Sequence, residues 1–418
     1  MTGPAIAPNL ALDQLVNRRR AQGESIVHLG FGESRLPVFP PLAEHLARGA
    51  RRISYGPVAG DQASRDAVAG YFDRRDLPTD AEQVVLAPGS KPLLWAVQLA
   101  VPGDVLLPCP AWNTYAPQAR LAGKTVIEVP IHPDYGGVPD PDVLREAVHT
   151  ARRAGHDPRI LILTLPDNPT GTLAPPELVA ALAEVAREED LHILSDEIYR
   201  DLVHDPASVV LSPAAVAPER TTITTGLSKN LALGGWRVGA VRFPPSPEGD
   251  LIRAKVTSIA SEVWSSLAAP MQDVAAYAFA EPPELVARLQ RSARLHGRVA
   301  YAVYESLIAA GASCRRPTAG FYLYPDFEPV RESLALRGIT DAKSLQQHLM
   351  DEFGIAVLSG DLLGDDPAAL RFRIATSQLY GDTPDQQQEA LDAGDPLAVR
   401  HVSGVLARIE ESFAKLCR

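Results

Sequence analysis

Cysteine is scarce in this sequence, and the three that occur, Cys109, Cys314 and Cys417, lie far apart along the chain. None belongs to a CxxC pair, so we expect neither a disulfide framework nor a metal site. The N-terminal residues also lack the ordered basic, apolar and small-residue regions of a secretory signal peptide. These absences favour a reducing compartment, and we expect the protein to be cytoplasmic.

An excess of basic over acidic residues is lacking too, and so are long apolar runs. Forty Lys and Arg residues against 51 Asp and Glu give a net charge of −11, whereas a nucleic-acid surface needs a basic stripe. No uncharged apolar run approaches the ~18 residues that a membrane span requires. We therefore expect no nucleic-acid or membrane partner. The 46% hydrophobic and 22% charged content is ordinary for a globular protein, and 418 residues are enough for two domains.

Short aliphatic or β-branched runs alternate with helical stretches from about residue 84 onward. They occupy residues 84–86, 105–107, 125–129, 160–165, 192–197, 221–225 and 238–243. Most are nearly continuous apolar runs, which are typical of strands buried on both faces of a parallel sheet. The sequence therefore predicts an α/β domain whose sheet of about seven mainly parallel strands is sandwiched by helices.

The remaining segments predict a second, smaller domain. We assign 1–40 to an N-terminal arm that belongs to the small domain, 41–290 to the large domain and 291–418 to the small α+β domain. A helix is expected near residues 10–21, and strands are expected within TAGFYLYPDF, GIAVLSG and LRFRIATS. The polar tract 381–396 is expected to be an exposed excursion.

Polar residues follow four of the predicted strands of the large domain. Because the carboxyl ends of parallel strands meet at one edge of a sheet, these residues should converge there. Ser90 and Lys91 begin a helix whose free N–H groups could bind a phosphate, or Ser90 could be an ordinary helix cap. Trp112 could stack on a flat ring or belong to the core. Asn168 lies in a proline-rich turn that could be purely structural.

Asp196 emerges from a buried apolar strand and needs a partner, because an unpaired buried carboxylate is costly. A protonated heteroaromatic nitrogen would satisfy it, and so would an arginine or a helix N-terminus. Tyr199 follows on the same turn.

Lys229 follows Ser228 directly after the strand TTITTG, and Arg237 comes eight positions later. A desolvated lysine is partly neutral near pH 7 and can form a Schiff base with an aldehyde. The planar guanidinium of Arg237 could bind a phosphate on the same cofactor. A ring stacker, a phosphate cup, an acid, a phenol, an amide and an imine lysine are together what pyridoxal 5′-phosphate requires.

The order PGSK, PAW, LPDNPTGT, SDEIY, GLSKN…GGWRVG and RFRIATS resembles the fold-type I, class I/II aminotransferase family, which is aspartate aminotransferase-like. The resemblance runs from about Gly30 to Ser377. It implies that Lys229 forms an internal aldimine and shuttles a proton, that Asp196 pairs with the pyridinium nitrogen, and that Asn168 and Tyr199 bond the ring oxygen. It further implies that Trp112 stacks on the cofactor ring. The phosphate contacts that it implies come from Ser90, Lys91, Ser228 and Arg237.

The resemblance also predicts substrate contacts and an assembly. Gly32 matches a glycine whose backbone meets the substrate carboxylate. Counting back four residues from Ala375 gives Arg371 as the first choice for the carboxylate-binding arginine, with Arg373 as the alternative. Tyr55 matches a tyrosine that the family lends to the neighbouring subunit, which implies a homodimer with shared active sites.

Transamination between an amino acid and a 2-oxo acid is the function that the resemblance favours. A pyridoxal-phosphate lyase, oxidase, hydroxylase or cyclase on the same scaffold is the alternative, because pocket side chains decide which bond at Cα breaks. The effector-sensing half of a transcription regulator is a third hypothesis. It would need a basic DNA-binding module, and the roughly 40 residues before the fold are too few and not basic enough for one. The amino donor cannot be read from the sequence.

Overall fold

Seven strands form the central sheet of the computed structural model, which describes residues 6–417; residues 1–5 of the predicted N-terminal arm lie outside the described residues. Their order in the sheet is β2-β8-β7-β6-β5-β3-β4, and β8 alone runs in the direction opposite to the other six strands. The predicted mainly parallel seven-stranded sheet is confirmed. The strands are β2 (Val84–Ala87), β3 (Asp104–Cys109), β4 (Val126–Pro130), β5 (Pro158–Thr164), β6 (His192–Asp196), β7 (Thr221–Gly226) and β8 (Gly239–Arg242).

Helices cover both faces of this sheet, as the apolar strands require. Successive side chains of a strand point to opposite faces: Val84 packs in one core cluster and Val85 in another. One face is covered by α4 (Ser90–Ala100), α5 (Tyr115–Leu121) and α10 (Pro247–Val263). The other face is covered by α2 (Pro40–Gly49), α3 (Gln62–Asp73), α6 (Pro141–Arg153), α7 (Pro176–Glu188), α8 (Pro213–Val216), α9 (Leu227–Asn230) and α11 (Ala269–Ala280).

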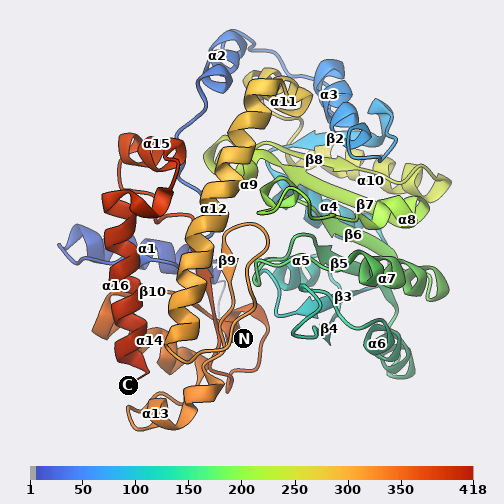
Figure 1. The fold of residues 1–418 in the computed structure, drawn as a ribbon. Helices are drawn as coiled ribbons and strands as arrows, with labels where there is room; N and C mark the ends of the chain where they lie inside the picture. Colours follow the sequence, from blue (N-terminus) through green and yellow to red (C-terminus); the bar gives the residue numbers. More distant parts are fainter. Residues whose placement is uncertain (1–5, 418) are drawn as a thin grey trace.

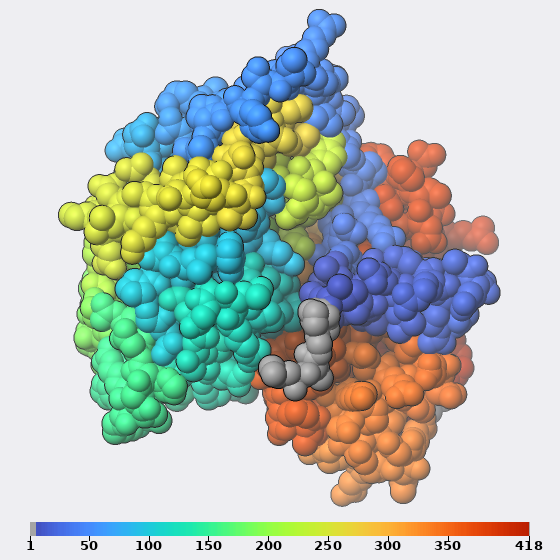
Figure 2. All heavy atoms as spheres, turned by 180° about the vertical axis from the view of Figure 1, so that it is seen from behind, coloured from blue at the N-terminus to red at the C-terminus, as the bar shows by residue number. Residues whose placement is uncertain are grey.

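A second core is built from the C-terminal part of the chain together with its N-terminal segment. The strand β1 (Val27–His28) pairs in parallel with β10 (Ile355–Ala356), so the two ends of the sequence meet. Seen from behind in Figure 2, the dark blue α1 (Pro8–Ala21) lies against the orange C-terminal part. The other elements of this unit are β9 (Tyr322–Leu323), β11 (Leu358–Ser359), β12 (Phe372–Ala375), α13 (Arg331–Ala335), α14 (Ala342–Phe353), α15 (Pro384–Asp392) and α16 (Arg400–Leu416).

The long helix α12 (Pro283–Ala309) joins the two cores (Figure 1). Leu285 and Leu289 pack in the core of the large sheet, whereas Val299 and Val303 pack in the C-terminal core. The proposed division at residue 290 therefore falls inside a helix that serves both units, and the division into 1–40, 41–290 and 291–418 stays a prediction.

The tract 381–396 differs from its prediction. It contains α15, whose Ala390 and Leu391 are buried in the C-terminal core, so it is only partly an exposed excursion. The high polarity of the tract concealed this short apolar face. Among residues 6–417, no helix combines the length and the apolar composition that crossing a bilayer requires.

Candidate active site

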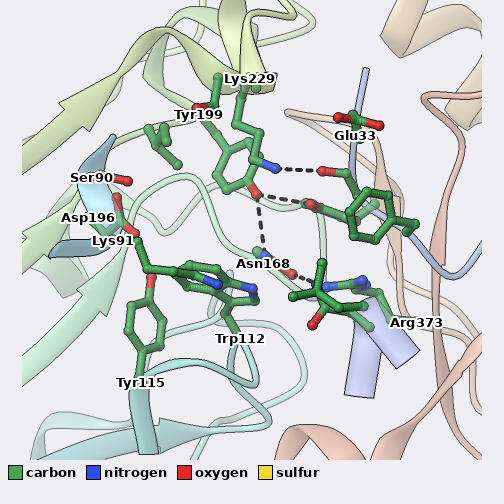
Figure 3. A pocket seen from close by; sticks show the side chains of 18 of the residues that line it. Glu33, Ser90, Lys91, Trp112, Tyr115, Asn168, Asp196, Tyr199, Lys229 and Arg373 are labelled. Atoms are coloured by element: carbon green, nitrogen blue, oxygen red, sulfur yellow. Dashed lines mark hydrogen bonds between the residues drawn. The ribbon is translucent and has the colours of Figure 1, made fainter. Parts of the chain in front are cut away.

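One cavity of about 390 Å³ opens where the carboxyl ends of the parallel strands meet. The turns after β2, β3, β5, β6 and β7 all contribute side chains to it. Because β8 runs the opposite way, the residues just before it reach the same edge. Figure 3 shows how these side chains converge. Ten predicted site residues line the cavity: Gly32, Ser90, Lys91, Trp112, Asn168, Asp196, Tyr199, Ser228, Lys229 and Arg237.

Asp196 ends β6 with its side chain fully buried and no cation paired with it among residues 6–417. The Tyr115 hydroxyl donates to its carboxylate at 2.8 Å, and the Thr224 hydroxyl donates at 3.2 Å. Burial raises the pKa of Asp196 to about 6, although these hydrogen bonds oppose the shift. The carboxylate therefore lacks the positive partner that would stabilise its charge.

Asn168, Tyr199 and Tyr322 form a connected polar group on the opposite wall. The Asn168 amide donates to the Tyr199 hydroxyl at 3.3 Å, and the Tyr199 and Tyr322 hydroxyls lie 2.9 Å apart. Burial raises the pKa of Tyr199 well above its ordinary value, so this phenol keeps its proton. It can therefore donate a hydrogen bond to an oxygen in the cavity.

Lys229 projects into the cavity from α9, the short helix that follows β7. Its Nζ donates to the carbonyl oxygen of Gly32 at 2.5 Å, a contact drawn in Figure 3. Gly32 must be a glycine here, because a Cβ at this position would lie 2.0 Å from the Tyr322 hydroxyl. The predicted amine and the predicted backbone contact thus face each other directly.

A corner rich in hydrogen-bond donors lies beside Lys229. Ser90 begins α4, and Gly89 before it has a φ of +89° with the Arg237 guanidinium packed against its backbone. Arg237 itself adopts the left-handed region with a φ of 58°, a conformation that costs roughly 1 kcal/mol in a residue with a side chain. No carboxylate pairs with Lys91 or Arg237 in the described part of the chain. The corner therefore suits an anion.

The structure separates the two candidate arginines: Arg371 is the first choice from the sequence and Arg373 the alternative, and of the two Arg373 lines the cavity. The guanidinium of Arg371 donates to Asp326 at 2.9 Å and to Asp365 at 3.0 Å, and Arg371 does not line the cavity. Arg373 does line it, and only 1% of its surface is exposed. The reason is structural: Arg371 precedes β12 and bridges to Asp326, whereas Arg373 lies within the strand.

Arg373 is a buried cation with unused hydrogen-bonding capacity. Its Nη1 donates to the Asn168 side-chain oxygen at 3.2 Å and its Nη2 donates to the Gly30 carbonyl at 2.9 Å. Its Nε is buried without a partner, and no carboxylate pairs with it among residues 6–417. A carboxylate entering the cavity would supply both the missing acceptor and the missing negative charge.

Two buried tyrosines of the site were not predicted from the sequence. Tyr115, the first residue of α5, holds Asp196, and Tyr322 of β9 holds Tyr199. Tyr115 follows Trp112 by three residues in the stretch PAWNTY, which was a usable signal. Nothing in the local sequence around Tyr322 indicates its partner. Tyr55 lies outside the cavity and is 88% exposed, so its predicted role at a neighbouring subunit stays a prediction.

The chain is similar to known proteins over most of its length. The family model for aminotransferase class I and II matches residues 24–380. The aspartate/prephenate aminotransferase of Thermus thermophilus is 32% identical over 82% of this chain and 84% of its own length. A bifunctional aspartate aminotransferase and glutamate/aspartate-prephenate aminotransferase of Petunia hybrida is 31% identical over 85% of this chain and 74% of its own.

The fold is similar as well. The solved structure of Thermus thermophilus aspartate aminotransferase with maleate superimposes with a TM-score of 0.82 at 27% identity, covering 99% of this chain and 97% of that one. The chain therefore belongs to the class I and II aminotransferase family, and it is an enzyme that transfers amino groups.

Proposed function

We propose that this aminotransferase uses pyridoxal 5′-phosphate to move an amino group from an α-amino acid to a 2-oxo acid. The observation that carries the proposal is the charge pattern of the cavity. A buried acid without a cation, a buried cation without an acid and an anion-binding corner surround one amine. A phosphorylated pyridine aldehyde would bring a cationic ring nitrogen to the acid, a phosphate to the corner and an aldehyde to the amine. The carboxylate of an amino acid would pair with the buried cation.

The residues present fit that cofactor. Asp196, buried and unpaired, suits a protonated ring nitrogen. Ser90, Ser228 and Arg237 supply donors for the phosphate, and Trp112 lies at the cavity wall where a ring would be bound. When bound, pyridoxal phosphate supplies an aldehyde that condenses with amines and a ring that accepts electrons.

Each protein group then has a definite task. Lys229 Nζ, which projects into the cavity, would accept the proton that leaves the amino acid's Cα and would donate it again to the carbon atom of the cofactor that receives the amino group. Asp196 would stabilise a protonated ring nitrogen, and Tyr199 would donate a hydrogen bond to the ring oxygen. Arg373 binds the substrate carboxylate and fixes its orientation, with the Asn168 amide oxygen holding the guanidinium in place.

We also propose a homodimer in which Tyr55 reaches the neighbouring active site. Ile53 is 95% exposed and Tyr55 is 88% exposed, and both border a surface hollow that also includes Val263. Two such apolar side chains left in water favour an interface there. A cytoplasmic location stays a prediction. The names of the relatives make aspartate and glutamate the first amino donors to test.

A half-reaction assay tests the proposed function. We expect each effective amino acid, added alone to the enzyme with its cofactor, to convert the visible absorbance band of the bound cofactor, and a 2-oxo acid to restore it. Lys229→Ala should bind the cofactor and show no conversion. Ammonia release or oxygen consumption, with no band that a 2-oxo acid restores, would contradict transamination and favour a lyase or an oxidase.

A further inference from the structure

A second and larger cavity, of about 620 Å³, lies apart from the active site and shares no lining residue with it. One wall is the 3₁₀ turn η2 (Arg200–Leu202) with the loop that continues to Pro206. The opposite wall is the first half of α12, the helix that runs along the front of the molecule in Figure 1. Arg75, just after α3, and Glu281 close one end.

The acids of this cavity have no capacity left for a ligand. Asp201 accepts from the Tyr71 hydroxyl at 3.1 Å, from Arg75 at 2.7 Å and from the Asn230 amide at 2.8 Å. Glu281 accepts from Arg75 and from the neighbouring arginine at position 74. A cationic ligand would have to displace donors that are already in place.

Arg294 and Gln290 project from α12 at the solvent-exposed rim of the cavity, and neither side chain makes a hydrogen bond or an ion pair with another of residues 6–417. Arg200 donates only through its two terminal nitrogens, to Glu197 and to a backbone carbonyl. No carboxylate among residues 6–417 pairs with Arg294, so an anionic head group at the rim would give this guanidinium a charged partner.

The floor beside these donors is apolar. Val286, Leu289 and Ala293 lie three and four positions apart on α12, so they share one face of the helix. Val203 and Pro206 face them from the loop after η2. We propose that this cavity is a binding site for a small amphipathic anion, with its charged head at Arg294 and Gln290 and its apolar body between α12 and the loop.

Binding of 8-anilinonaphthalene-1-sulfonate to the holoenzyme tests the site, because this anion fluoresces when its rings enter an apolar cavity. We expect one saturable site per chain. Arg294→Ala should weaken it about tenfold or more through loss of a charge-assisted hydrogen bond. Ala293→Trp should abolish it by filling the space. Displacement by hexanoate or by hexyl phosphate then shows which head group the site prefers.

Arg298→Ala is the matched control, because Arg298 lies one turn further along α12 and pairs with Asp395 outside the cavity. This control should bind the probe as the wild type does, and thermal unfolding should show that all variants are folded. Equal binding in wild type, Arg294→Ala and Ala293→Trp would overturn the proposal. Loss of binding in Arg373→Gln would also overturn it, by placing the probe in the active site.

Discussion

Asp196 shows how burial prepares a side chain for a partner that the protein itself does not provide. The folded chain surrounds its carboxylate with Tyr115 and Thr224, and neither carries a charge. Burying a carboxylate without a charged partner disfavours its ionised form. Burial therefore raises the pKa of Asp196 to about 6 from an ordinary value near 3.8. Part of the folding free energy is thus given up where the cofactor is expected to bind.

This cost predicts a pH dependence for the cofactor-free enzyme. Well below the ordinary pKa of 3.8, both the folded and the unfolded states hold the Asp196 proton, and its contribution to stability is fully present. As the pH rises toward 6 the unfolded state releases that proton first, so stability is lost, by at most about 3 kcal/mol. We therefore expect the Asp196→Asn apoenzyme to gain stability relative to wild type between pH 4 and 7.

Urea unfolding of both apoenzymes across that range measures the difference. Asp167, whose pKa burial raises to about 7, is present in both proteins and cancels. Parallel curves for the two proteins would show that Asp196 titrates normally. With the cofactor bound, the same variant should turn over much more slowly than wild type, because asparagine cannot hold a proton on the ring nitrogen.

Arg373 and Arg371 provide a paired test at the same scale. Arg373→Gln should lower kcat/KM for amino acids about 100-fold or more, since a buried charge pair with the substrate carboxylate is lost. Arg371→Gln should leave the substrate KM close to the wild-type value and act through stability, because Asp326 and Asp365 lose their partner. Steady-state kinetics with several amino donors distinguish the two, and the reverse pattern would restore the original assignment to Arg371.

Among the elements, the helix α9 carries both Ser228 and Lys229 on only four residues, so two side chains of the site depend on one short helix. Such a short helix has little stability of its own. Asn230, its last residue, is tied to Asp201, and Asp201 is in turn held by Tyr71 and Arg75. The orientation of Lys229 thus depends on contacts with η2 and α3, on the side of α9 away from the cavity.

Removing that tie should loosen α9. We expect Asn230→Ala to destabilise the protein by about 1–2 kcal/mol and to weaken cofactor binding as well. Gln387→Ala is a suitable control, since it removes a similar part-buried hydrogen bond, from the Gln387 side-chain amide in α15 to the Gly381 carbonyl. Urea unfolding and fluorescence titration with the cofactor measure the two effects. A loss of stability with unchanged cofactor affinity would mean that Asn230 does not position Lys229.

At the scale of the whole molecule, the active site depends on both units of the chain. Asn9 and Leu10 of α1 line the cavity, and Asn9 accepts a hydrogen bond at 3.1 Å from Asn113 of the large unit. Figure 2 shows α1 reaching from the C-terminal unit toward the cyan part of the large one. Arg373 comes from the C-terminal unit and Lys229 from the large one, so the proposed binding of a substrate carboxylate by Arg373 would depend on how the two units are held together.

The exposed side chains at Ile53 and Tyr55 predict an assembly of two chains. We expect the enzyme to sediment as a dimer and Ile53→Asp to sediment as a monomer with weakened cofactor binding, because a charge at the proposed interface would have to be desolvated. Leu336→Asp, at an equally exposed leucine elsewhere, should remain a dimer. A monomeric wild type would contradict the shared active site.

The sequence by itself determined the central sheet and most of one site. Short, continuous, β-branched apolar runs between helical stretches are typical of strands buried on both faces, and residues that follow parallel strands share one edge of the sheet. That logic places Ser90, Asn168, Asp196 and Lys229 together before any coordinates are known. It depends on local pattern and chain direction alone.

Tertiary structure decided the rest. The preference for Arg373 over Arg371 depended on where β12 begins and on the hydrogen bonds that Arg371 makes to Asp365 and to Asp326, which is 45 positions away in the sequence. Tyr322 became part of the site only because β9 packs beside Tyr199, 123 positions away. Contacts between distant segments are set by the packing of whole elements, and no local pattern records them.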